Sequence, residues 1–172
     1  DIVFGPIFSR RLGSSLGVNL LPSKGKLCNF DCVYCECGWN KDGIAERVFP
    51  RLEEVQAALE EKMSKAASEG VPVDSITFSG NGEPTMNPDF PEIVDVTLEL
   101  RDRFFPDAKV SVLSNATLIG RPAVAEALMK VDNPILKIDA SSDSLIAKIN
   151  KPVGRYRLDE VVEAMMKFEG LF

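Results

Sequence analysis

The chain has 172 residues, of which 45% are hydrophobic and 27% charged, and its formal net charge is −6. This balance is typical of a folded globular protein, and the surplus of acidic groups disfavours a protein whose main role is to coat nucleic acid. No apolar run approaches the roughly 20 residues of a membrane span and no secretory signal opens the sequence, so we expect a cytoplasmic protein without a membrane partner.

The first predicted elements lie on either side of a cysteine-rich loop. The apolar run over residues 16–21 predicts a short strand that leads into this loop. Apolar residues at helical spacing over 52–63 predict a helix, which ends near Gly70. The segment VDSITFSG, residues 73–80, predicts a buried strand that closes on glycine.

Five more elements follow in the second half of the chain. They are a helix over 90–98 that stops near Pro106, a strand over 109–113, a helix over 122–131, a strand over 135–141 after Pro134, and a helix over 159–168 with Asp159 near its N-cap and Gly170 as its stop. Strands that alternate with helices indicate parallel βαβ units, with the ligand site at the carboxyl ends of the strands. The length predicts one domain over residues 1–172 and no second domain.

All four cysteines lie in CNFDCVYCEC, residues 28–37, and the chain contains no histidine. Disulfides are typical of secreted domains, and here every bridge would close a very short loop. Structural zinc sites usually join two separated pairs of ligands, whereas this chain has a single group of thiols. An iron–sulfur cluster fits better, because closely spaced thiolates on one loop can bind several corners of one cuboidal cluster.

The spacing C-x-x-x-C-x-x-C of Cys28, Cys32 and Cys35, with Tyr34 before the last cysteine, resembles the cluster-binding loop of the radical S-adenosylmethionine (radical SAM) superfamily. The resemblance implies that these three thiolates hold a [4Fe–4S] cluster whose fourth iron is left for SAM. It also implies that Tyr34 packs near the adenine of SAM; the alternative is an ordinary loop aromatic. Cys37 is interpreted as a free thiol near the cluster rather than a ligand.

The segment GNGEPT, residues 80–85, resembles the glycine–glutamate motif with which this superfamily holds the SAM amino group. Glycines at a strand end let the backbone approach a ligand, and a carboxylate can accept hydrogen bonds from an ammonium group. Gly80, Asn81, Gly82 and Glu83 are therefore candidate SAM contacts, with Glu83 as the residue that binds the amine. Taken alone, the segment would be read as a turn.

Small polar residues end the third predicted strand, and charged residues lie along the fourth. Ser114 and Asn115 are candidate contacts to the ribose or carboxylate of SAM, and a helix cap or turn is an equally good interpretation. Lys137 and Asp139 alternate with Ile138, so they are expected on one side of a strand. They form either an ion pair at the mouth of the barrel or, for Asp139 first and Lys137 second, a contact to SAM.

The resemblance implies an α/β fold, a partial parallel (βα) barrel of radical SAM type with about four βα units, and we expect it to be truncated at the C-terminus. It also implies a radical SAM oxidoreductase-like enzyme that cleaves SAM reductively to a 5′-deoxyadenosyl radical, with an electron donor such as flavodoxin or ferredoxin. The opening segment, GNGEPT and NKPV (150–153) are most similar to the branch containing the wyosine-tRNA synthases, so RNA is a candidate substrate that the charge does not support. A glycyl-radical-enzyme activating enzyme and a non-catalytic iron–sulfur or zinc-binding protein are the alternatives.

Overall fold

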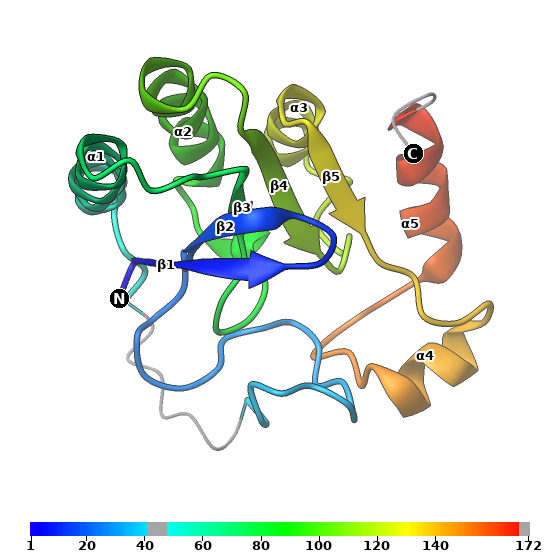
Figure 1. Cartoon of the computed structure of the whole chain (residues 1–172). Helices are drawn as coiled ribbons and strands as arrows, with labels where there is room; N and C mark the ends of the chain where they lie inside the picture. Colours follow the sequence, from blue (N-terminus) through cyan, green and yellow to red (C-terminus); the bar gives the residue numbers. More distant parts are fainter. Residues whose placement is uncertain (41–47, 169–172) are drawn as a thin grey trace.

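The structure, a computed structural model, describes residues 1–40 and 48–168. Within them five strands form one sheet in the order β1–β2–β3–β4–β5 (Figure 1). The strands are β1 (Val3–Ser9), β2 (Gly13–Val18), β3 (Ser75–Phe78), β4 (Lys109–Ser114) and β5 (Asn133–Leu136). The helices are α1 (Leu52–Ser68), α2 (Phe90–Phe104), α3 (Pro122–Lys130), α4 (Asp143–Ile149) and α5 (Leu158–Met165), with short 3-10 helices η1 (Pro84–Met86) and η2 (Met166–Phe168).

Strands β2 to β5 are parallel to one another, and β1 pairs antiparallel with β2. Helices α1, α2 and α3 cover one face of this sheet, with α1 against α2 and α2 against α3 (Figure 1). The alternation of parallel strands with covering helices confirms the predicted α/β fold class. Among the residues described, no helix is both long enough and apolar enough to cross a membrane.

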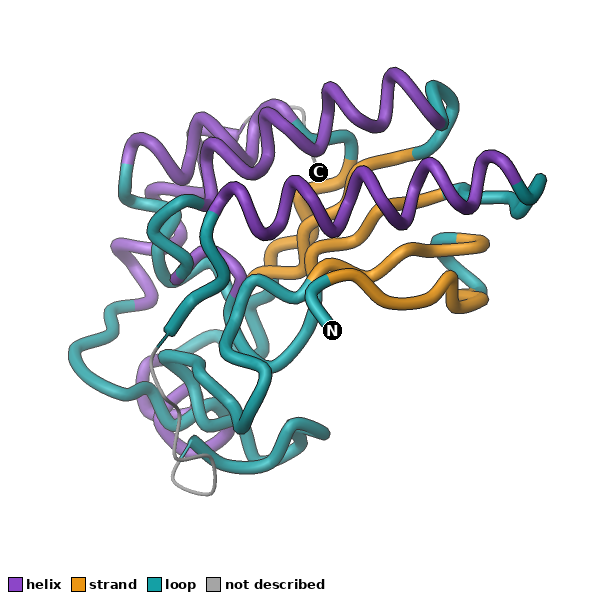
Figure 2. The backbone as a smooth tube through the Cα atoms, turned by 90° about the vertical axis from the view of Figure 1, so that its left-hand side faces the viewer, coloured by secondary structure: helices purple, strands orange, loops and turns teal. Residues whose placement is uncertain are grey.

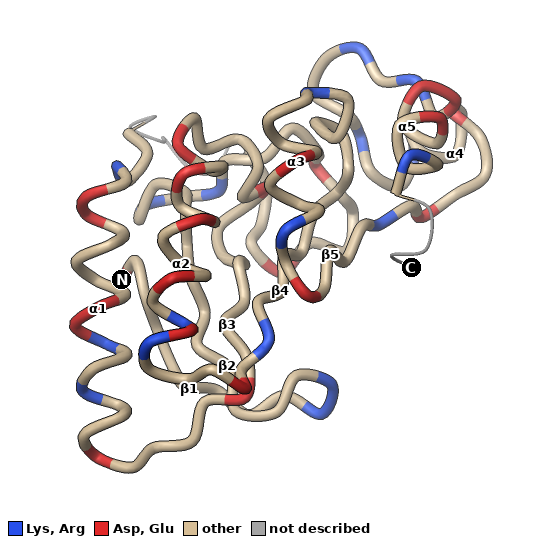
Figure 3. The backbone as a smooth tube through the Cα atoms, turned by 90° about the horizontal axis from the view of Figure 1, so that it is seen from above, with Lys and Arg blue, Asp and Glu red and all other residues tan. Residues whose placement is uncertain are grey.

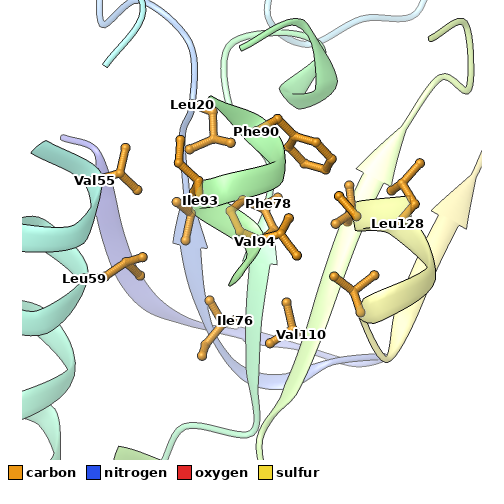
Figure 4. Close-up of a cluster of buried hydrophobic side chains, with 14 of the residues drawn as sticks. Leu20, Val55, Leu59, Ile76, Phe78, Phe90, Ile93, Val94, Val110 and Leu128 are labelled. Carbon is orange, nitrogen blue, oxygen red and sulfur yellow. The ribbon is translucent and has the colours of Figure 1, made fainter. Parts of the chain in front are cut away.

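The hydrophobic core lies between the covering helices and the sheet (Figure 4). Leu59 of α1, Ile93 of α2 and Ile76 of β3 are fully buried there, and the Phe78 and Phe90 rings meet edge to face with centroids 6.1 Å apart. Each such side chain stabilises the fold by about 1.5–3 kcal/mol when it leaves water. Because this core holds the helices on one face, the ends of the strands remain free to carry a site.

The N-terminal strand pair differs from the sequence-based prediction. Strand β1 was not predicted, because Gly5 and Pro6 interrupt the alternation that marks a strand, and the pairing register shifts between Phe4 and Ile7. The strand predicted over 16–21 instead spans Gly13–Val18. Its small N-terminal residues carry little strand propensity, but their backbones pair with β1 on one side and β3 on the other.

The C-terminal elements also differ in their ends. Strand β5 stops at Leu136 rather than at residue 141. The Lys137 amide donates to the carbonyl of Ser114, the last residue of β4, so β4 offers no further strand residue to pair with. Helix α4 was not predicted; it has only seven residues and is capped by the Ser142 hydroxyl, which accepts from the Leu145 amide. The N-cap of α5 is Arg157, not Asp159, and the predicted stop at Gly170 lies outside the described residues.

Candidate functional site

A cavity of about 570 Å³ lies where the parallel strands end, between the loops after β3, β4 and β5 and the cysteine loop. Figure 2 shows that the connecting loops gather at this end of the sheet. The cavity is lined by most of the residues that the sequence singled out: Cys28, Cys32, Tyr34, Cys35, Gly80, Gly82, Glu83, Ser114 and Asn115. Asn81 and Asp139 do not line it. Lys26, Cys37 and Lys137 do, together with an apolar wall that includes Leu113, Ile135 and Ile138.

One end of the cysteine loop is fixed to the glycine-rich loop after β3. Leu27 forms an isolated parallel bridge with Gly82, in which the Leu27 amide donates to the Asn81 carbonyl at 2.8 Å. At Gly82 φ is +148°, and a Cβ there would meet the Leu27 carbonyl oxygen at 1.8 Å. A Cβ at Gly80 would meet the Asn19 side chain at 2.2 Å. Both glycines are thus required by close contacts with neighbouring loops.

The middle of the loop, between Cys28 and Cys35, is bonded to the end of α4 and to the residues that follow it. The Asp31 amide donates to the Asn150 carbonyl at 2.8 Å, and the Val33 amide donates to the Ile149 carbonyl at 2.9 Å. Phe30 pairs with Pro152 in an isolated antiparallel bridge. The loop that carries the thiols therefore has its shape set by backbone contacts to residues more than 100 positions away.

Lys26 is a buried cation at the base of the cysteine loop. Its ammonium group lies 3.0 Å from Asp31 and 3.2 Å from the Gly38 carbonyl oxygen. Burial acts to lower the pKa of Lys26, but the hydrogen bond to Asp31 and the negative charge of that carboxylate outweigh it, so the pKa is raised. The cation remains charged and close to the thiols.

The thiols differ in exposure and in their hydrogen-bond partners. Cys32 is buried, Cys28 and Cys35 are half-buried and Cys37 is exposed; all four are free. The Cys28 sulfur accepts from the Phe30 amide at 3.4 Å, and burial raises the pKa of this thiol to about 11. The Cys37 thiol donates to the Gly80 carbonyl at 3.4 Å, which holds it at the edge of the cavity.

The donor set fits an iron–sulfur cluster with one open iron. Cys28, Cys32 and Cys35 line a single cavity, and three thiolates can each bind a different iron of a cuboidal cluster. In the described part of the chain, no group of three or more Cys, Asp or Glu side chains converges as ligands to a single metal ion. A cluster does not require such convergence, since its ligands are spread over several irons.

Glu83 is a buried carboxylate that joins the ends of β3 and β4. It is 2% exposed, and it accepts hydrogen bonds from the Thr85 amide at 3.2 Å and the Thr85 hydroxyl at 2.5 Å. The Ser114 hydroxyl donates to it at 2.8 Å and the Asn115 amide at 2.7 Å. Burial raises the pKa of Glu83, and the four hydrogen bonds oppose that shift. One carboxylate thus fixes the geometry of two strand ends.

The contacts of Ser114 and Asn115 explain why both are buried beside the cavity. The Ser114 hydroxyl binds Glu83 and also accepts from the Ala116 amide at 3.1 Å. The Asn115 amide nitrogen Nδ2 donates to Asn29 at 2.7 Å and lies 3.6 Å from the Cys28 sulfur. The two residues therefore do more than cap a turn, because they connect β4 to Glu83 and to the first cysteine.

A polar cluster lies beyond the end of β5, and two of its members, Tyr34 and Lys137, line the cavity. The Tyr34 hydroxyl and the Lys137 ammonium both donate to Asp139, and Lys137 also donates to Tyr34. Burial and the hydrogen bond to Asp139 raise the pKa of Tyr34 to about 12. Lys137 and Asp139 lie beyond the end of β5 rather than on a strand, but they form the predicted ion pair at 3.0 Å. Asn150 joins this cluster through its side-chain amide.

Two residues of this site were not predicted, Lys26 and Asn150. A lysine before a cysteine motif is ordinarily solvated, and only the turn that brings Asp31 back to Lys26 buries this one. Asn150 is fully buried and its Nδ2 lies 3.2 Å from the Cys32 sulfur, across 118 positions of sequence. Neither local spacing nor propensity reports such a contact. In the sequence, Asn150 stood out only as part of NKPV, residues 150–153, to which no structural role was given.

Comparison with known proteins gives a family and a shared fold. Residues 23–171 match the family model of the radical SAM superfamily. The chain is 36% identical over 169 residues to a UPF0026 protein of Methanocaldococcus jannaschii, covering 97% of this chain and 49% of that protein. Its fold is similar to that of native anSMEcpe with bound AdoMet, with a TM-score of 0.62 and 22% identity over 91% of this chain and 41% of that one.

A second structural likeness is to TYW1 with a lysine-pyruvate adduct bound, with a TM-score of 0.54 and 16% identity over 91% of this chain and 51% of that one. The chain spans about half the length of the curated relatives it matches. The structural likenesses confirm the predicted radical SAM type of α/β fold. Because the family match extends over most of the residues and includes the cysteine motif, the chain belongs to the radical SAM superfamily, whose members use a [4Fe–4S] cluster and SAM.

Proposed function

We propose that this chain carries the catalytic core of a radical SAM enzyme, in which Cys28, Cys32 and Cys35 bind the cluster and SAM occupies the cavity. The observation that supports this proposal is the cavity itself, which brings the three thiols and the glycine–glutamate loop together at the carboxyl ends of parallel strands. The proposal includes a cytoplasmic enzyme and a one-electron donor such as flavodoxin or ferredoxin.

When bound, the cluster supplies the electron that cleaves SAM to methionine and a 5′-deoxyadenosyl radical, which abstracts hydrogen from the substrate. The chain's own residues would bind and orient SAM and shield the radical from solvent. Glu83 keeps the glycine-rich loop and the end of β4 in register, and it lines the cavity in which the ammonium group of SAM would bind. Leu113, Ile135 and Ile138 are 39–43% exposed and form an apolar wall of the same space, which bound SAM would cover.

The experiment that tests this function is anaerobic reconstitution with iron and sulfide, followed by electron paramagnetic resonance of the reduced protein with and without SAM. We expect the signal of a reduced [4Fe–4S] cluster, and a change in its shape when SAM is added, because one iron has no protein thiolate. A signal whose shape does not change with SAM would contradict the proposal that one iron is open to SAM. Zinc in place of iron would favour the non-catalytic alternative.

For the substrate, the finer proposal is an RNA base. It is supported by the similarity of the sequence motifs to the wyosine-tRNA-synthase branch and by a local excess of positive charge. Residues 148–157 contain four Lys or Arg and no Asp or Glu, although the whole chain is acidic. Arg155 and Arg157 pair with Glu160, Asp159 and Asp143, so the proposal depends on the two lysines, Lys148 and Lys151. Figure 3 shows blue Lys and Arg positions along the segment that leads from α4 to α5. Lys148 lies in the last turn of α4. The segment is bonded to the cysteine loop, so an anionic backbone bound there would lie beside the cavity.

Binding of tRNA at several salt concentrations tests the finer proposal. We expect affinity to fall as salt rises, and the double variant Lys148→Gln/Lys151→Gln to reduce the slope of log K against log salt by about 1–2, since each lost phosphate contact reduces it by about 1. The matched control is Lys65→Gln/Lys109→Gln, which removes the same charge from exposed positions at the other end of the strands. Equal slopes for the two double variants would contradict the assignment of this segment.

A further inference from the structure

We infer that Asn150 and Asn115 are positioning residues that donate N–H···S hydrogen bonds to the cluster-bound thiolates of Cys32 and Cys28 and thereby raise the reduction potential of the cluster. The inference rests on the proposed function, because it requires the cysteines to bind a cluster. It assigns a role to the NKPV segment and gives Asn115 a role different from contact with SAM.

Asn150 contacts Cys32 through a side chain that is completely buried. Its Nδ2 lies 3.2 Å from the Cys32 sulfur, 3.3 Å from the Tyr34 hydroxyl and within hydrogen-bonding distance of Asp139. Lys137 approaches the same sulfur at 3.7 Å. These contacts place two donors at one thiol: Lys137 from the segment after β5 and Asn150 from the segment after α4.

Capping of α4 does not require this side chain. The Asn150 backbone amide donates to Ile146 at 2.8 Å and its carbonyl accepts from Asp31, and any residue could make both bonds. Within the described residues, Asn150 Oδ1 is a buried polar atom without a hydrogen-bond partner. A buried amide that leaves its oxygen unpaired needs a reason, and the donor end beside Cys32 supplies one.

Asn115 makes the equivalent contact to Cys28. Its Nδ2 lies 3.6 Å from the Cys28 sulfur and 2.7 Å from Asn29. Its Oδ1 accepts from the Thr117 amide at 3.1 Å and from the Thr117 hydroxyl at 2.7 Å. These bonds fix which end of the amide faces the sulfur, so the Asn115 contact to Cys28 is also that of a donor.

The effect on potential follows from charge. Reduction adds one negative charge to a cluster whose thiolates share it, and donors that point at those sulfurs stabilise the reduced form more than the oxidised form. Removal of one donor therefore shifts the midpoint potential to a more negative value. At a fixed applied potential we expect about a tenfold smaller ratio of reduced to oxidised cluster, which is about 59 mV for a one-electron couple.

The test is a potentiometric titration of the reconstituted full chain, followed by electron paramagnetic resonance, for the unsubstituted protein, Asn150→Leu and Asn115→Ala. Leucine at position 150 removes both the donor and the unpaired oxygen at similar size. The matched control is Asn87→Leu, since Asn87 is equally buried but donates to the backbone carbonyls of Leu20 and Pro50. Thermal unfolding of each protein before reconstitution measures the structural effect separately.

We expect a more negative midpoint for Asn150→Leu and Asn115→Ala, and the original midpoint for Asn87→Leu even where its stability falls. If Asn150→Leu does not fold, the shift in Asn115→Ala decides the matter. A cluster that assembles with an unchanged midpoint in the variants at 115 and 150 overturns this inference alone. Failure of the unsubstituted chain to assemble any cluster overturns the proposed function and this inference with it.

Discussion

Alanine at Cys28, Cys32 or Cys35 will abolish assembly of the cluster, whereas alanine at Cys37 will leave it intact. The first three thiols line one cavity, and a cluster held by only two of them lacks a thiolate at one iron; we expect Cys37, which the Gly80 carbonyl holds at the cavity edge, not to replace it. Cys37 is exposed and makes a weak hydrogen bond to the Gly80 carbonyl, so its loss costs little. Iron and sulfide content after reconstitution measures the difference: about four of each in Cys37→Ala, and close to none in the other variants.

Cys37→Ala is the internal control, because it removes a thiol from the same cavity and the same loop. Its reduced spectrum should still respond to SAM. A cluster that is lost with Cys37 would make this residue a ligand and would close the iron that SAM needs. A full cluster in any one of the three other variants would remove that cysteine from the ligand set.

Glu83→Ala will lower the free energy of unfolding by about 3 kcal/mol or more and will eliminate SAM binding by the reconstituted protein. The change leaves donors of Thr85, Ser114 and Asn115 without their acceptor in a buried position, and each unpaired group costs about 1–3 kcal/mol. The ends of β3 and β4 then lose the group that connects them. Denaturant unfolding measures the first effect and calorimetric titration with SAM the second.

Two further variants make this result specific. Glu83→Gln keeps the size and one acceptor oxygen, so it should fall between the alanine variant and the original protein in both measurements. Glu60→Ala removes an exposed carboxylate that pairs with Arg103 on the surface, and should change the free energy of unfolding by less than about 1 kcal/mol. Stability in Glu83→Ala equal to that of Glu60→Ala would show that the strand ends do not depend on the buried carboxylate.

The sequence predicted the elements whose cause is local. The helical spacing of Val55 and Leu59 in α1 reflects burial of one helix face, and the apolar run of β3 reflects burial on both faces of a parallel strand. The sequence-based prediction missed strand β1, because Gly5 and Pro6 interrupt its strand pattern and the strand forms only by pairing with β2. The predicted end of β5 at residue 141 was wrong, because β5 ends at Leu136, where its pairing partner β4 ends at Ser114.

In the candidate site too, the sequence predicted what depends on local patterns and missed what depends on contacts between distant segments. Parallel strands bring their carboxyl ends to one edge, so the order of motifs along the chain was enough to place Cys28, Glu83 and Ser114 around one cavity. The contacts that complete it, such as Asn150 to Cys32, join segments far apart in sequence, and they depend on how the loops fold back. Asn81 illustrates the converse, since its side chain donates to the Pro22 carbonyl and lies outside the cavity.

The backbone bonds that fix the start and the middle of the cysteine loop bear on whether the loop folds before or after it binds a metal. In a small zinc-dependent domain, metal binding supplies the energy of folding, and a chelator unfolds the protein. Here Leu27 is already bonded to the segment after β3, and Asp31 and Val33 to the segment after α4, by contacts that need no metal. We therefore expect the chain to keep these backbone contacts without a cluster, so that a chelator removes the metal without unfolding the protein, which circular dichroism before and after chelation would check.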